Sequence, residues 1–117
     1  MNILIVDDNP SMRRLLRRAI SEFSATIWEC ADGEESVAKY TQERPDLVLM
    51  DICLPGIDGL EATRRIVRSH PDARIIVVTN YDDGDVRMAA SKSGARGYVC
   101  KQNLLYLGDV IRTVQSQ

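Results

Sequence analysis

Five polar side chains of the sequence each follow or end a short apolar run: Asp7, Asp8, Asp51, Thr79 and Lys101. A charge at the edge of a core is costly unless a partner or a ligand compensates it. If the three carboxylates lie close together they repel one another, so a cation is expected among them or one of them holds a proton. Carboxylate oxygens with no His or Cys nearby are typical ligands of Mg²⁺ or Mn²⁺.

A carboxylate beside such a metal ion can also act as a nucleophile. It can attack a phosphoryl group and hold it as an acyl phosphate. The metal ion and Lys101 would then neutralise the phosphoryl oxygens, and Thr79 could donate a hydrogen bond to one of them. The "LPG" after Asp51 predicts a sharp turn that brings a backbone carbonyl near Cys53 to the metal.

The elements that position these residues follow from the alternation of apolar runs with helical patterns. Strands are expected at 3–6, 25–31, 46–50, 74–79 and 97–100, and helices at 10–23, 32–43, 58–70, 82–94 and 103–116. Right-handed crossovers between such strands give an α/β, doubly wound, five-stranded parallel sheet of order 2-1-3-4-5, a flavodoxin-like fold. Ligands bind such sheets at the carboxyl ends of the strands, where the strand order reverses. The five polar residues are therefore expected at one edge of the sheet.

Composition excludes several classes of protein. The chain has 117 residues and a net charge of −2, which predicts one domain over residues 1–117 without a basic surface for nucleic acid. No apolar run approaches the roughly 20 residues of a membrane span, and the N-terminus has no signal-peptide pattern. We expect a cytoplasmic protein. The cysteines are three and widely spaced, which favours free thiols over disulfides or a zinc site.

Four motifs, taken together and in order, resemble the receiver domain of two-component response regulators: "IVDD", "LVLMDICLPGIDG", "VVTN" and "GARGYVCK". The resemblance implies that Asp51 is the phosphoacceptor and that Asp8 is a direct metal ligand. It implies that Asp7 acts through a metal-bound water and that Cys53 contributes its backbone carbonyl. The implied cofactor is Mg²⁺ or Mn²⁺, and the implied activity is a phosphorylation switch with self-dephosphorylation, not a separate enzyme.

The resemblance also assigns the remaining positions of the site. Thr79 is the switch hydroxyl, Tyr98 the switch aromatic, and Lys101 the partner of the phosphoryl group. Gln102 stands where the family often has a proline, and this departure resembles the NarL/LuxR subgroup. In that subgroup a helix-turn-helix domain follows the receiver, so we expect transcription regulation through an output domain that is absent from this chain. The implied partners are a sensor histidine kinase or phosphotransfer protein, a possible second copy after phosphorylation, and DNA only through the output domain.

Other interpretations of the same residues stay open. Asp7 and Asp8 could merely cap the first helix, and Tyr98 could simply pack on an edge strand. A haloacid-dehalogenase-type phosphatase would need an acid at the position of Cys53, and a flavodoxin-type carrier would need a less acidic first loop. A degenerate receiver could act only as a protein-binding module. Clustered carboxylates also predict that Asp7→Asn or Asp8→Asn stabilises the metal-free protein.

Overall fold

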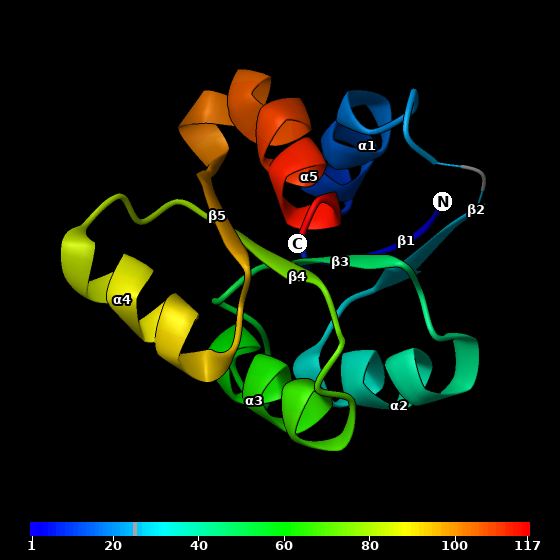
Figure 1. Ribbon diagram of the computed structural model, residues 1–117, viewed down its shortest axis with the longest axis vertical. Helices are drawn as coiled ribbons and strands as arrows, with labels where there is room; N and C mark the ends of the chain where they lie inside the picture. The colour runs from blue at the N-terminus through cyan, green and yellow to red at the C-terminus, as the bar shows by residue number, and fades with distance from the viewer. Residues whose placement is uncertain (25) are drawn as a thin grey trace.

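The apolar runs form one parallel sheet in the computed structural model, which describes residues 1–24 and 26–117. Its strands are β1 (Asn2–Val6), β2 (Thr26–Cys30), β3 (Leu47–Met50), β4 (Ile75–Thr79) and β5 (Gly97–Cys100). They are ordered β2-β1-β3-β4-β5, and every neighbouring pair is parallel (Figure 1). This order confirms the predicted topology. The first residue of the expected strand 25–31 lies outside the described residues.

The helices connect the strands in the expected alternation. They are α1 (Pro10–Ala19), α2 (Gly33–Glu43), α3 (Gly59–Ser69), α4 (Gly84–Ser93) and α5 (Leu107–Gln115), with a 3-10 helix η1 (Lys101–Tyr106) before the last. Four of them begin at an Asn or Asp whose side chain accepts backbone N–H groups of the first turn: Asn9, Asp32, Asp58 and Asp83. Such caps satisfy donors that have no partner inside the helix.

Two apolar cores cover the two faces of the sheet. On one face α1 and α5 pack on strand residues that include Ile3, Ile5 and Leu49, and on the other α2 and α3 pack on residues that include Leu4 and Val48 (Figure 1). Helix α4 contacts α3 and the edge strand β5. Because both faces are covered, the central strands are apolar on both sides until they end.

Two helices differ from the prediction. The first was expected to reach residue 23 but ends at Ala19, although Ile20 beyond it is still fully buried. The helix expected over 103–116 is divided into the end of η1, whose Asn103 has a non-helical φ of −124° and ψ of 45°, and α5, which begins only at Leu107. Gly108 consequently lies in the first turn of α5 and is not a weak point in the middle of a helix. A Cβ there would stand 3.5 Å from the Phe23 ring, which is an ordinary van der Waals contact, so the packing at this position does not require glycine.

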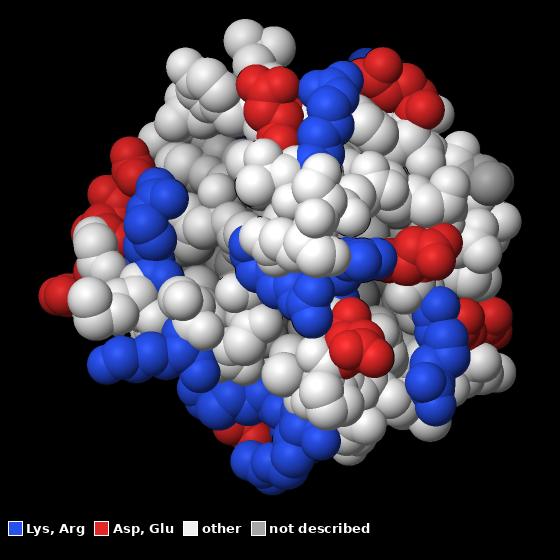
Figure 2. Space-filling view, viewed as in Figure 1, with Lys and Arg blue, Asp and Glu red and all other residues white. Residues whose placement is uncertain are grey.

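The surface carries charges of both signs. On the face shown in Figure 2, Lys and Arg side chains gather mostly over the lower part, and acidic side chains are distributed around them. Within the described residues, no helix is long and apolar enough to cross a membrane.

Candidate functional site

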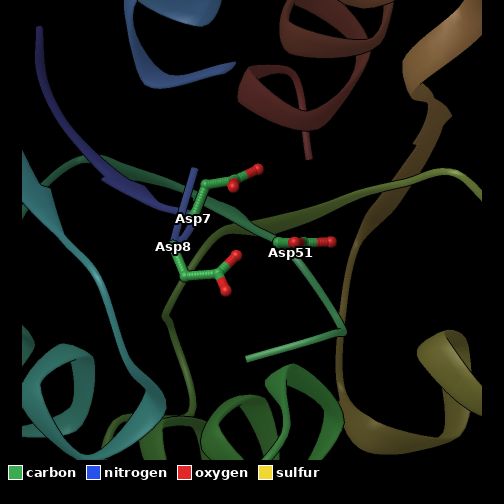
Figure 3. A group of neighbouring side chains, drawn as sticks. All are labelled: Asp7, Asp8 and Asp51. Carbon is green, nitrogen blue, oxygen red and sulfur yellow. The ribbon is translucent and has the colours of Figure 1, made fainter. Parts of the chain in front are cut away.

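Three carboxylates from two neighbouring strands converge at one edge of the sheet (Figure 3). Asp7 and Asp8 directly follow β1, and Asp51 directly follows β3. One carboxylate oxygen from each of the three lies within 4.8 Å of the others. The strands β1 and β3 are the pair at which the strand order reverses, so the group occupies the position predicted from the sequence.

The three acids differ in their surroundings. Asp7 is almost fully buried, and its Oδ1 accepts the Asn9 amide (N···O 2.9 Å). Its Oδ2 is buried as well and accepts no hydrogen bond of good geometry from the described residues, with only the Lys101 ammonium beside it. Asp51 is 5% exposed, whereas Asp8 is exposed to solvent. Asp8 and the space beside it are therefore the part of the cluster that a solvated ion can reach first.

Lys101 supplies the positive charge inside the cluster. Its Nζ lies 2.9 Å from Asp7 Oδ2 and 3.2 Å from Asp51 Oδ2, and its side chain is 9% exposed. Burial disfavours the charged ammonium, but its close contact with the Asp7 carboxylate and the charge of Asp51 outweigh this effect and raise the pKa of Lys101. Lys101 therefore remains an ammonium at neutral pH.

Asp51 shows the opposite balance. Burial raises the pKa of its carboxyl group, and the nearby charge of Lys101 offsets this only in part. The charge of Asp7 raises the pKa further. Asp51 is thus a carboxylate whose charge is incompletely compensated by the protein, which is the condition that favours binding of an additional cation.

The loop after Asp51 is fixed by its backbone. The Asp51 amide donates to the Val6 carbonyl (2.9 Å), and the Gly59 amide donates to the Ile52 carbonyl (2.8 Å). A Cβ on Gly59 would stand 1.8 Å from the Asp51 carbonyl oxygen, so only glycine allows α3 to start this close to the site. Gly56 has a φ of +73°, which places the turn where "LPG" predicts it. Cys53 lies inside this loop as an exposed free thiol.

Thr79 and Tyr98 lie on the neighbouring strands β4 and β5. Thr79 is 1% exposed at the end of β4, and its Oγ1 is 3.5 Å from the Tyr81 amide. The Tyr98 hydroxyl donates to the Tyr81 backbone carbonyl. The Arg87 guanidinium lies over the Tyr98 ring, 4.6 Å from its centroid. The partly exposed Tyr98 ring is therefore held by one contact from the loop after β4 and one from the first turn of α4, both within the segment 81–87.

Two contacts near the site are absent from the sequence prediction. The Cys53 thiol lies 3.6 Å from the Tyr81 hydroxyl, across the loops that follow β3 and β4. Arg13 in α1 donates to the Asp7 backbone carbonyl (2.7 Å) and to Glu29 of β2 (2.8 Å). Their signal in the sequence is weak, because each pair joins residues that are adjacent only after the sheet forms.

The fold is that of a doubly wound α/β domain, and the carboxylates at the edge of its sheet form a group of the kind that can hold a divalent cation. The family described as response regulator receiver domain matches residues 3–106. The chain therefore belongs to the receiver domain family of two-component response regulators, a class of domain that acts as a phosphorylation-dependent signalling switch.

Similar proteins support the same assignment. The response regulator GacA of Pseudomonas viridiflava is 37% identical over 103 residues, which are 86% of this chain and 48% of that protein. The chain thus spans about half the length of this curated relative. A two-component response regulator of the LuxR family from Aurantimonas sp. SI85-9A1 has a TM-score of 0.93 and 36% identity, over 98% of this chain and 84% of the other. The predicted resemblance to the NarL/LuxR subgroup is confirmed.

A further solved structure bears on the site. The CheX-CheY-BeF3-Mg²⁺ complex from Borrelia burgdorferi matches with a TM-score of 0.91 and 28% identity, covering 97% of this chain and 88% of that chain. That complex contains Mg²⁺ and a beryllium fluoride group.

Proposed function

We propose that this receiver domain accepts a phosphoryl group on Asp51 in a reaction that requires Mg²⁺ or Mn²⁺. The observation that carries the proposal is the position of Asp51, buried at the end of β3 with Lys101 Nζ 3.2 Å from its Oδ2 and two further carboxylates in reach. The donor set fits a hard divalent cation, because it consists of carboxylate oxygens around a partly uncompensated charge. We assign Asp8, Asp51 and the Cys53 carbonyl as direct ligands and Asp7 as a ligand through water.

The residues of the chain have separate tasks in this chemistry. Asp51 attacks the phosphorus of the donor and forms an acyl phosphate, while the bond from phosphorus to the donor breaks. The bound divalent ion supplies charge neutralisation. Lys101 pairs with a phosphoryl oxygen, exchanging part of its present contact with Asp51, and Asp7 keeps the ammonium in place. Hydrolysis by water later restores Asp51.

The switch is proposed to reside in Thr79 and Tyr98. A phosphoryl oxygen on Asp51 would accept a hydrogen bond from the Thr79 hydroxyl. This new bond would weaken the contact of 3.5 Å in which Thr79 Oγ1 accepts the Tyr81 amide. The contacts that hold the Tyr98 ring outward come from Tyr81 and Arg87 in the same segment, so movement of this segment releases the ring. The affected surface comprises α4, β5 and η1. There Leu105 and Tyr106 are 98% and 62% exposed, whereas Leu107 next to them is buried.

Receiver domains interact with histidine kinases or phosphotransfer proteins. For this chain we propose a sensor histidine kinase or phosphotransfer protein as donor, homodimerisation after phosphorylation, and regulation of transcription through an attached DNA-binding domain. The support is the family and the length of the relatives, of which the chain spans about half. The alternative, a receiver that acts only as a binding module, is opposed by the full acid and lysine set.

The test is the intact mass of the protein after incubation with acetyl phosphate and Mg²⁺. We expect one added phosphoryl group in the parent chain, and none in Asp51→Asn or in the parent with excess EDTA. Asp46→Asn is the matched control, since Asp46 precedes the same strand at its opposite end and accepts the Asn2 amide there. Full phosphorylation of Asp51→Asn contradicts the proposal.

A further inference from the structure

The β1–α1 segment that carries Asp7 and Asp8 is held from outside by one arginine. Arg13 Nη1 donates to the Asp7 backbone carbonyl (2.7 Å), and Arg13 Nε donates to Glu29 Oε1 (2.8 Å). Its side chain is 19% exposed, compared with 48% for Arg17 and 32% for Glu29. A single guanidinium therefore joins α1, the edge strand β2 and the acidic segment.

The Asp7 carbonyl belongs to the peptide group that connects Asp7 to Asp8. Its orientation sets where the Cα of Asp8 lies and in which direction the exposed Asp8 side chain extends. The other side of Asp7 is already fixed, because its amide donates to the Cys30 carbonyl (3.1 Å) and its Oδ1 accepts the Asn9 amide. Arg13 provides the remaining restraint on this peptide group, on the side facing α1.

Glu29 makes this restraint compatible with cation binding. A free guanidinium beside an acidic cluster would repel a divalent ion, whereas Glu29 places a carboxylate directly on it. Glu29 also accepts from Arg17 at 2.6 Å, and the hydrogen bond from Arg17 lowers the pKa of its carboxyl group despite the opposing effect of burial, with Arg13 adding to the lowering. Glu29 is therefore ionised at neutral pH, and it orients the Arg13 fork toward the Asp7 carbonyl.

We propose that Arg13, oriented by Glu29, is a positioning residue for the divalent-cation site. It acts through the Asp7–Asp8 peptide group and touches neither the ion nor the phosphoryl group. This inference rests on the proposed function, since it assigns a support to the same site. Groups that orient metal ligands from behind typically change metal affinity by about 10-fold or more when they are removed.

Arg17 offers a matched control. It lies one turn further along α1, carries the same charge and binds the same Glu29, to which it donates at 3.2 and 2.6 Å. Within the described residues it donates no hydrogen bond to Asp7. Arg17→Gln and Arg13→Gln thus remove one positive charge each from the same helix face. Only Arg13→Gln removes the bond to the Asp7 carbonyl.

The experiment is a Mg²⁺ titration of the metal-free proteins. Binding is monitored through the NMR chemical shifts of the backbone amides of Asp8, Asp51 and Cys53. We expect Arg13→Gln to bind Mg²⁺ about 10-fold more weakly than the parent, and Arg17→Gln to stay within about 2-fold of it, as removal of an exposed ion pair predicts. Arg13→Lys should lie between, because an ammonium keeps the charge but cannot reproduce the fork. Thermal melting without metal, measured on all variants, separates a loss of folding from a loss of affinity.

The outcomes distinguish this inference from the function on which it rests. Equal Mg²⁺ affinity of Arg13→Gln and Arg17→Gln overturns the positioning role while leaving the site in place. If the parent itself shows no shifts at these amides with millimolar Mg²⁺, the proposed site and the inference both fall. Should Arg13→Gln not fold, the comparison of Arg13→Lys with Arg17→Lys decides in the same way.

Discussion

The ammonium of Lys101 lies 3.2 Å from Oδ2 of Asp51, although 49 positions separate the two residues in the chain and they leave different strands of the sheet. The same ammonium is 2.9 Å from Asp7. One cation thus holds two buried carboxylates that would otherwise repel each other. Its exchange between Asp51 and a phosphoryl group is the simplest link between the present structure and the proposed chemistry.

Replacing Lys101 tests that link. Lys101→Met keeps most of the apolar stem but removes the charge, so the phosphoryl oxygens lose a preorganised partner. We expect phosphorylation by acetyl phosphate to slow about 100-fold, which is the typical effect of removing one electrostatic donor from an enzyme active site. Lys92→Met, on the exposed face of α4, is the control. Equal rates for the two variants, measured by intact mass over time, would exclude the assigned role.

The raised pKa of Asp51 predicts how stability depends on pH. Because the folded state holds this proton more tightly than the unfolded chain, the free energy of unfolding falls as the pH rises from the unfolded pKa through the raised pKa, and the penalty is complete once the pH exceeds the raised pKa. Asp51→Asn has no such penalty. In EDTA it should be more stable than the parent above the raised pKa of Asp51, with a difference that shrinks as the pH is lowered through that pKa. Urea unfolding at several pH values measures this, and a constant difference contradicts it.

The two acids after β1 should respond differently to neutralisation. The sequence predicts stabilisation for both Asp7→Asn and Asp8→Asn, yet Asp7 is paired with Lys101 and accepts the Asn9 amide, whereas Asp8 is exposed. We now expect Asp8→Asn to stabilise the metal-free protein by about 1 kcal/mol. Asp7→Asn should destabilise it, because it removes one side of a buried ion pair. Melting curves in EDTA that rank the two variants in the reverse order would contradict this.

Two glycines at helix starts should give opposite results. At Gly59 a Cβ would stand 1.8 Å from the Asp51 carbonyl oxygen, so Gly59→Ala must shift α3 or the loop of the site. We expect a loss of about 3 kcal/mol, at the upper end of overpacking effects. Gly84, at the start of α4, has no heavy atom within 4 Å of the same position. Gly84→Ala should stabilise by roughly 0.5 kcal/mol. Chemical denaturation of both variants provides the comparison.

Tyr81 is expected to slow the loss of the phosphoryl group. Its ring is 48% exposed, and its hydroxyl lies 3.6 Å from the thiol of Cys53, two residues after Asp51. The ring therefore extends over the loop beside which a hydrolytic water must approach. Tyr81→Ala should lose phosphate a few-fold faster, which corresponds to less than about 1.4 kcal/mol in the barrier. Tyr81→Phe retains the ring and should decay like the parent. Decay of Tyr81→Ala at the parent rate would show that the ring does not shield the site.

The sequence predicts the sheet and the acidic edge well, because both follow from where apolar runs stop. Asp7, Asp8, Asp51 and Lys101 are each placed by the end of a strand, and a parallel sheet brings those ends together. The helix boundaries were less predictable. The apolar pattern continues to Phe23 although the helix stops at Ala19, since a side chain can be buried in a turn as well as in a helix.

Contacts between side chains of separate elements were beyond the sequence. Arg13 and Arg17 look like the solvated face of a helix, and only the position of β2 beside β1 brings Glu29 to them. The same holds for Cys53 and Tyr81, whose proximity depends on the path of two loops. The pairing of Tyr98 with the Tyr81 carbonyl likewise requires knowledge of a rotamer, which spacing alone does not contain.

The side chains of the strands alternate between the two cores, and this alternation also determines where the polar residues of the site point. Ile3, Ile5, Leu47, Leu49 and Val99 face α1 and α5, whereas the intervening residues of the first and third strands face α2 and α3. Asp7, Asp51 and Lys101 each stand two positions beyond a member of the first set, so the pleat brings all three to the same side of the sheet. Inserting or deleting one residue in one of these strands would turn the side chains of that strand to the opposite faces of the sheet. The same change would turn its member of the Asp7, Asp51 and Lys101 cluster away from the other two. The alternation of side chains along each strand therefore determines both which residues fill each core and which polar residues meet at the site.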